Sequence, residues 1–299
     1  MPFSGFLKAI NTLPKNTHKT TVVFTGGEPL LRKDIEDCGY ELRKHGYHWG
    51  LVSNGYLYNK QRHNSLLNAG MGALTLSLDG MAAEHNWLRN AKKSFDKVVE
   101  AIEIAAQSKR LNFDVVTCVN QRNLSSLGEI YHLLKNKSVS AWRLFTIAPI
   151  GRARINKELL LLPEQFKMMM DFIVEYRAKK EMDVKFSCEG FVGEYENKVR
   201  DSNFFCRAGI NIGSVLIDGS ISACPNIDRQ FTQGNIYTDN FFEVWQNRFQ
   251  PFRNRNWTKT DRCATCSSFN DCLGNGFHYR KFGEEKVLVC HKQLLENSI

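Results

Sequence analysis

Short apolar runs alternate with helical patterns through the first half of the chain. Between the runs, apolar residues recur every three or four positions, as Ile35, Cys38 and Leu42 do, which is typical of helices with one buried face. The runs are rich in Val, Leu, Phe and Thr and end in Gly, Asn or Pro, as buried parallel strands do. Strand and helix alternating at this spacing predict right-handed βαβ units and a parallel sheet. The five predicted strands span residues 21–26, 48–55, 73–80, 112–120 and 141–149.

Three further helices and one hairpin are predicted. Ser4 and Ser94 stand where N-caps belong, so helices are expected to begin there, the first over 4–13. Residues 163–180 predict a helix whose buried side includes Phe166 and Ile173. In the second half, GSVLIDGSISACP predicts a hairpin that turns at Asp218-Gly219. The loop-rich remainder has little apolar core and is expected to need metal for stability.

Cysteine usage is the unusual feature of the composition. The 299 residues include nine cysteines, five of them between Cys206 and Cys272. The start has no secretory signal, and no apolar run is long enough for a membrane span. We therefore predict a cytoplasmic protein, whose reduced thiols are metal ligands before they are disulfides.

The clustered cysteines predict a metal centre. The ligand candidates follow the pattern Cys206, Cys224, Cys263-x2-Cys266-x5-Cys272 and Cys290. Four thiolates of this kind suit tetrahedral zinc or a cubane iron–sulfur cluster, and the spacing alone does not choose between them. Cys38 and Cys118 lie in apolar patterns and are expected in the core. His291 is expected at the surface.

A second set of polar residues lies at the ends of the predicted strands. Gly26 and Gly27 directly follow the first apolar run, where they let the backbone approach a ligand, and Glu28 adds an acceptor that could hold an ammonium group. Later strand ends carry Ser53-Asn54-Gly55 and Ser77-Leu78-Asp79-Gly80. Because parallel strands present their carboxyl ends at one edge, these polar tips are expected to converge on one pocket.

These motifs resemble the radical S-adenosylmethionine (radical SAM) enzymes, with GGEPLL, SNG and SLDG following the second, third and fourth barrel strands. The C-terminal pattern resembles the SPASM extension, most closely in the group described as a radical SAM/lipoprotein system. The resemblance implies a partial (β/α)6 TIM-like barrel over 1–155, a connecting helix and strand over 156–200, and a small Cys-rich α+β SPASM domain over 201–299. It implies S-adenosylmethionine binding by one set of residues, with Arg89 the weakest match: Gly26, Gly27, Glu28, Ser53, Asn54, Ser77 and Arg89.

The resemblance departs from the family pattern at the catalytic cluster. The C-x3-C-x2-C motif that binds this cluster after the first strand is absent, because no cysteine precedes Cys38. We therefore expect an N-terminally shortened chain that begins after the first barrel strand, and that does not cleave S-adenosylmethionine by itself. Without that strand, residues 21–25 should form an unpaired sheet edge.

A second departure concerns the auxiliary clusters. By family analogy, Cys263, Cys266, Cys272 and Cys290 hold one auxiliary [4Fe-4S] cluster. Cys206 and Cys224 would be half of a second, because Gly276 stands where the family has cysteine. Cys188 or His278 could replace a ligand, or this second cluster could be lost.

Two readings of function follow. The first is a radical SAM/SPASM enzyme, or a truncated form, which modifies a peptide or small protein by radical chemistry and needs an electron donor. The alternative is a non-catalytic, zinc- or cluster-stabilised binding protein with a degenerate barrel. The net charge of +9 suits a solvated basic surface or an acidic peptide, whereas nucleic-acid binding is disfavoured because basic and aromatic residues do not interleave.

Overall fold

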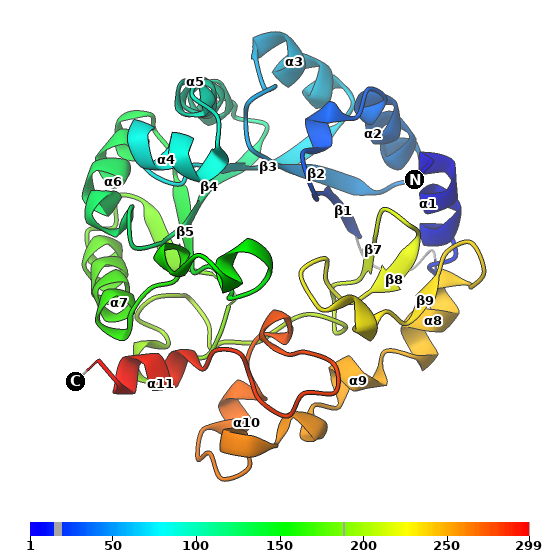
Figure 1. Ribbon diagram of the computed structural model, residues 1–299. Helices are drawn as coiled ribbons and strands as arrows, with labels where there is room; N and C mark the ends of the chain where they lie inside the picture. The colour runs from blue at the N-terminus through cyan, green and yellow to red at the C-terminus, as the bar shows by residue number, and fades with distance from the viewer. Residues whose placement is uncertain (15–19, 188, 299) are drawn as a thin grey trace.

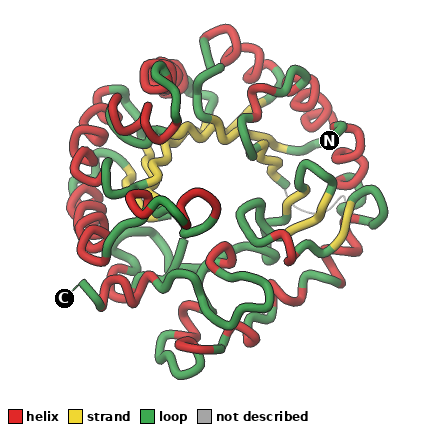
Figure 2. Tube along the Cα trace, viewed as in Figure 1, coloured by secondary structure: helices red, strands yellow, loops and turns green. Residues whose placement is uncertain are grey.

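The computed structural model describes residues 1–14, 20–187 and 189–298. Its first part is a curved sheet of six parallel strands in sequential order, with helices along its outer side (Figures 1 and 2). Each strand pairs in parallel with the next, which confirms the predicted βαβ alternation. The strands are β1 (Thr21–Phe24), β2 (His48–Ser53), β3 (Met71–Ser77), β4 (Asn112–Cys118), β5 (Ala141–Phe145) and β6 (Asp183–Phe186).

The helices of this part bury one apolar face against the sheet. Ile35, Cys38 and Leu42 are all buried, as their spacing predicts. These helices are α1 (Phe3–Ile10), α2 (Ile35–Lys44), α3 (Lys60–Asn68), α4 (Ala82–Arg89), α5 (Ser94–Ala106), α6 (Leu127–Asn136) and α7 (Pro163–Ala178).

The two faces of the sheet differ in polarity. Strand residues that alternate toward the helices, such as Leu74 and Trp142, are buried. Residues of the other alternation carry polar groups: Thr75 Oγ donates to Asp114 Oδ1 at 2.6 Å, and Arg143 pairs with the same carboxylate. The concave side of the barrel is therefore polar where its strands can meet a ligand.

Strand β1 is the edge of the sheet. It pairs only with β2 among the described strands, and Val23 on it is 51% exposed. This confirms the expected open edge at residues 21–25.

The C-terminal part forms a second, phenylalanine-rich core beside this edge. Its antiparallel sheet confirms the hairpin at Asp218-Gly219, where Gly219 has a φ of 84°. Ala9 of α1 packs in this second core, and Thr12 Oγ accepts from the Phe242 amide at 3.2 Å. The elements are β7 (Ser214–Val215), β8 (Ser220–Ser222), β9 (Gly234–Asn235), α8 (Phe241–Asn247), α9 (Gln250–Arg253), α10 (Phe269–Cys272) and α11 (His291–Glu296).

Two predicted helix caps are wrong. Helix α1 begins at Phe3 with Pro2 as its N-cap residue, so Ser4 lies inside the helix. Helix α5 begins at Ser94 itself, with Lys93 preceding it, because the Ser94 hydroxyl is bonded to His85 Nε2 at 3.0 Å and does not cap.

Helix α7 and strand β6 join the first core, and β6 pairs with β5. The domain boundaries at 155 and 200 stay predictions. Within the described residues, no helix has both the length and the apolar character that crossing a membrane requires.

Close packing at Gly39 provides a test of the fold. A Cβ at this position would lie 2.3 Å from Cζ2 of Trp49, a buried ring held by a 3.1 Å bond from Nε1 to the Ala69 carbonyl. Overpacking costs about 1–3 kcal/mol, more than the ~1 kcal/mol that alanine gains in helix propensity. Gly39→Ala should therefore lower the urea midpoint of unfolding. Gly72→Ala, where no atom lies within 4 Å of the added Cβ, is the control; equal midpoints would contradict the prediction.

Candidate cofactor and cluster sites

Glu28 ties the carboxyl ends of β1 and β2 together. Its Oε1 accepts from Ser53 Oγ at 2.8 Å and from the Leu30 amide at 3.0 Å, and its Oε2 accepts from the Asn54 amide at 2.7 Å. A carboxylate has about four lone-pair sites, so these three bonds leave one for a ligand. The structure thus brings together three of the predicted cofactor-binding residues.

The two glycines before Glu28 leave their backbone accessible. Gly26 has a φ of 126°, which side chains rarely adopt, and no atom lies within 4 Å of a Cβ built on Gly26 or Gly27. A ligand can therefore approach the main chain here, as the sequence predicts.

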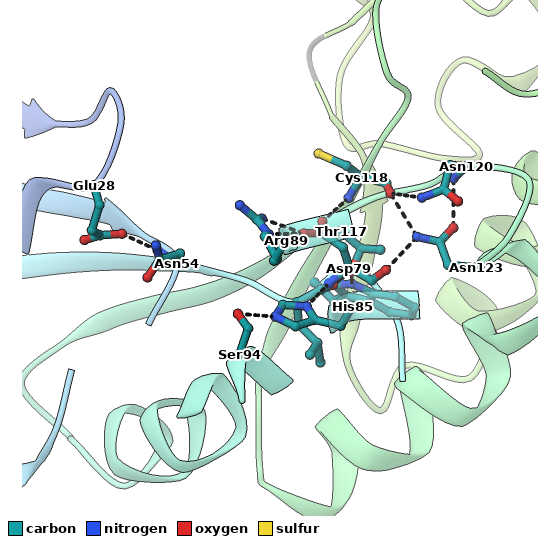
Figure 3. A network of polar contacts seen from close by, with 12 residues as sticks. Glu28, Asn54, Asp79, His85, Arg89, Ser94, Thr117, Cys118, Asn120 and Asn123 are labelled. Atoms are coloured by element: carbon teal, nitrogen blue, oxygen red, sulfur yellow. Dashed lines mark hydrogen bonds and ion pairs between the residues drawn. The ribbon is translucent and has the colours of Figure 1, made fainter. Parts of the chain in front are cut away.

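Asp79 organises the neighbouring strand end. Its carboxylate is 1% exposed and pairs with Arg89, whose Nε and Nη2 lie 2.7 and 2.5 Å from Oδ2 (Figure 3). Oδ1 accepts from the Cys118 amide at 2.8 Å, which joins the ends of β3 and β4. Arg89, expected to face the cofactor, is thus fixed by an ion pair at the end of α4. Ser77 ends β3 two residues before Asp79.

A set of neutral groups holds Asp79 in place. The Asp79 amide donates to His85 Nδ1 at 3.0 Å, and Asn123 Nδ2 donates to the Asp79 carbonyl at 2.8 Å (Figure 3). Burial lowers the pKa of His85 to about 4, so its ring is neutral and Nδ1 can accept.

Cys118 lies at the end of β4, outside the apolar core in which it was expected. The thiol is half-buried, and its side chain points to the same side as the Arg89 guanidinium, toward Glu28 (Figure 3). Burial and the nearby carboxylates of Asp79 and Glu189 raise its pKa. The prediction failed because β4 ends at Cys118 and not at residue 120 as expected, which makes Cys118 a strand tip.

Glu189 is a site residue that the sequence reasoning missed. It follows β6, is 6% exposed, and accepts from the Thr146 amide at 2.6 Å and from the Thr146 hydroxyl. Tyr279 of the C-terminal part adds a bond to it and lies 3.1 Å from Thr146 Oγ. Burial raises the pKa of Glu189 to about 7. An acidic residue just after a strand was the available signal, but that strand was assigned to a connecting segment.

His291 is buried in the same group, so the prediction of a surface position is wrong. It is 1% exposed, its Nε2 lies 3.4 Å from Thr146 Oγ, and its ring packs against Tyr279. Burial lowers its pKa to about 3. The ring faces the barrel because α11 begins at this residue and packs on α7.

Four C-terminal thiols influence each other electrostatically. Burial, with smaller contributions from Cys290 and Cys263, raises the pKa of Cys272 to about 12. Burial also raises the pKa of Cys290, with Cys263 and Cys266 contributing. No three His, Cys, Asp or Glu side chains of the described residues converge on a position for a single metal ion. A four-iron cluster is a different case, because each thiolate binds its own iron.

Two buried guanidinium groups lie beside the predicted ligands. Arg280 Nη2 is 3.2 Å from Cys263 Sγ, and Arg255 Nη2 donates to the Cys206 carbonyl at 2.5 Å. Arg255 Nη1 is buried and has no hydrogen-bond partner among the described residues. Cationic donors that are buried at both cysteine sites fit anionic clusters.

The second cluster site lacks room for the family's cysteine at position 276. A Cβ on Gly276 would lie 2.5 Å from the Glu189 carbonyl and 2.9 Å from Cε1 of His278. Burial lowers the pKa of His278 to about 4, which leaves a neutral imidazole beside that position. Cys188, the other replacement considered, lies outside the described residues. The ligand set of this site stays a prediction.

Comparison with known protein families gives one match in the barrel part and one in the C-terminal part. Residues 6–134 match the Radical SAM superfamily, and residues 206–267 match SPASM, an iron–sulfur cluster-binding domain. The chain contains a radical SAM domain and a SPASM domain. These domains imply S-adenosylmethionine and [4Fe-4S] clusters as its cofactors, which confirms the predicted family, fold and cofactor classes.

Two relatives and one solved structure illustrate the likeness. The AdoMet-dependent heme synthase of Oleidesulfovibrio alaskensis is 26% identical over 287 residues, covering 89% of this chain and 72% of that protein. The Fe-coproporphyrin III synthase of Methanosarcina barkeri is 25% identical, covering 85% and 70%. The structure of anSMEcpe with bound AdoMet and Cp18Cys peptide superposes with a TM-score of 0.73 at 20% identity, covering 99% and 86%, and shows the shared fold.

The buried Glu189 carboxyl predicts a specific pH dependence of stability. Its pKa rises from 4.5 to about 7 on folding, so the folded state binds more protons between these values. This group therefore reduces stability as pH rises from about 4.5 to 7, by up to about 3 kcal/mol. In Glu189→Gln that loss is absent, so the variant should gain stability relative to the parent between pH 5 and pH 8 in urea titrations. Glu194→Gln, which changes an exposed carboxylate, is the control. If the free energies of unfolding of Glu189→Gln and the parent differ by the same amount at pH 5 and at pH 8, the raised pKa of Glu189 is refuted.

Proposed function

We propose that this chain is a radical SAM/SPASM enzyme that acts on a peptide or small protein, or a truncated form of one, with S-adenosylmethionine held at the ends of β1 to β3. Because it has no C-x3-C-x2-C motif, it does not cleave this cofactor by itself. When bound beside a reduced catalytic cluster, this cofactor supplies a radical that abstracts hydrogen from a substrate. The chain's own residues bind and orient: Glu28 retains one acceptor site for the ammonium group, and the Gly26–Gly27 backbone is open to the ligand.

The Glu28 contacts are the observation that carries cofactor binding. One carboxylate fixes two neighbouring strand ends and is still able to accept another hydrogen bond. Ser77 and Arg89 would complete the site from the next strand end, where Arg89 already points toward Glu28 (Figure 3).

The exposed side chains of the loop after β5 are evidence for a substrate that carries acidic and apolar groups. Arg152 and Arg154 lie exposed in a short 3-10 helix (Gly151–Arg154), flanked by exposed Ile150 and Ile155. In Figure 1 this green segment lies inside the ring of strands and helices. Adjacent cationic and apolar side chains suit an acidic peptide segment.

Calorimetry with anaerobically purified protein tests the proposal. The purified chain should be brown, with iron and sulfide at about four per chain, and should bind S-adenosylmethionine. Glu28→Gln should raise the dissociation constant at least about tenfold, because a bond to a charged group contributes roughly 1.5–3 kcal/mol. Glu41→Gln, which changes a half-exposed side chain on α2, should leave the dissociation constant unchanged.

The same preparation should form no 5′-deoxyadenosine under reducing conditions, because the sequence contains no C-x3-C-x2-C. Colourless, zinc-containing protein that does not bind the cofactor would overturn the proposal in favour of a non-catalytic binding protein.

A tetrapyrrole substrate is the second candidate, favoured by the likeness to a heme synthase over 89% of this chain. Its carboxylates would use the same arginines as an acidic peptide. Titration with Fe-coproporphyrin III distinguishes the two: the peptide proposal predicts no saturable shift of the Soret band. A saturable shift that is lost in the Arg152→Glu/Arg154→Glu double variant would instead establish the tetrapyrrole site.

A further inference from the structure

Arg280 is a buried cation with a fixed geometry. The residue is 2% exposed, its Nε donates to the Gly274 carbonyl at 2.9 Å, and its Nη1 donates to the Glu285 carbonyl at 3.1 Å. Its Nη2 donates to Cys263 Sγ at 3.2 Å, within the range of N–H···S bonds. Two backbone anchors therefore aim the third donor at a predicted cluster ligand.

The backbone near Arg280 is shaped to accommodate it. Gly274 has a φ of 80°, and a Cβ there would lie 3.1 Å from Arg280 Nη2 and 2.2 Å from Thr258 Oγ. Glycine is therefore required both by the backbone conformation and by the space that the guanidinium and the threonine occupy.

Within the part of the chain that the structure describes, the charge of Arg280 has no carboxylate partner. None of the described acidic side chains forms an ion pair with it, and its contacts are two carbonyls and one thiol. A buried charge needs a compensating charge, because desolvation otherwise costs several kcal/mol. Cys263 is in direct contact with the guanidinium and becomes a thiolate when it binds iron, so it can supply that negative charge.

We propose that Arg280 sets the redox potential of the cluster held by Cys263, Cys266, Cys272 and Cys290. This inference rests on cluster binding at these cysteines. A cation that donates to a ligand sulfur stabilises the reduced cluster more than the oxidised one, because the reduced form carries one more negative charge. Arg280 therefore raises the potential and makes this cluster a better electron acceptor. Arg280 acts through Cys263 and is a positioning residue.

The first experiment is an anaerobic redox titration of the full chain, followed by EPR of the reduced cluster. Arg280→Met, which removes charge and donor, should shift the midpoint potential in the negative direction. Arg280→Lys, which keeps the charge but cannot reach both carbonyls and the thiol, should give a smaller shift of the same sign. Arg248→Met removes a half-exposed arginine paired with Asp239 in the same domain, and should give none.

A second measurement uses the unsubstituted chain, so it does not depend on a variant that folds. Protein labelled with guanidinium-15N arginine should show a 15N hyperfine coupling to the reduced cluster, and Arg280→Lys should lose it. An unshifted potential in iron-loaded Arg280→Met, or no 15N coupling in the labelled parent, would overturn the role of Arg280 alone. Failure of the parent chain to bind iron would overturn the cluster itself.

Discussion

The ion pair between Asp79 and Arg89 is the interaction on which the barrel's candidate site depends. A carboxylate that is almost fully buried persists only when it is paired and hydrogen-bonded. Asp79 meets this requirement with the guanidinium on one oxygen and the Cys118 amide on the other. Because these partners come from α4 and from β4, satisfying the charge also fixes the relative position of three elements. Glu28 acts in the same way between β1 and β2, with bonds to a hydroxyl and amides in place of an ion pair.

The two parts of the chain meet through polar contacts as well as apolar packing. Thr146 and Glu189, at the ends of β5 and β6, contact Tyr279, while His291 reaches the same threonine. Near neutral pH much of the Glu189 population is protonated and so can both donate and accept. A nearly neutral, directional network costs less to bury than a charged one, yet it permits only one docking geometry. The domain with the cluster cysteines is thereby held in register with the strand ends that form the cofactor site.

Sequence periodicity predicted the elements well, because each buried face follows from a simple repeat. The five predicted strands and the helix at 163–180 were found within a few residues of their expected ends. Glu28, Ser53 and Asn54 were also predictable, since the carboxyl ends of neighbouring parallel strands must converge. The predictions that were wrong concern side chains whose contacts are made with distant parts of the chain and not with their sequence neighbours. Ser94 bonds His85 instead of capping its helix, and His291 is buried because α11 docks on α7. Neither partner can be inferred from the neighbouring sequence.

The buried arginines show why the cluster sites could be predicted only in part. Cysteine spacing predicts that thiols gather, but it does not describe the environment that makes binding of an anionic cluster favourable. That environment comes from Arg280 and Arg255, which donate to the backbone and ligand atoms around Cys263 and Cys206. Arginine remains charged at any relevant pH, so each buried guanidinium is a constant cost to the fold until an anion lies beside it. The fixed cations beside these cysteines fit the anionic cluster that the SPASM domain implies.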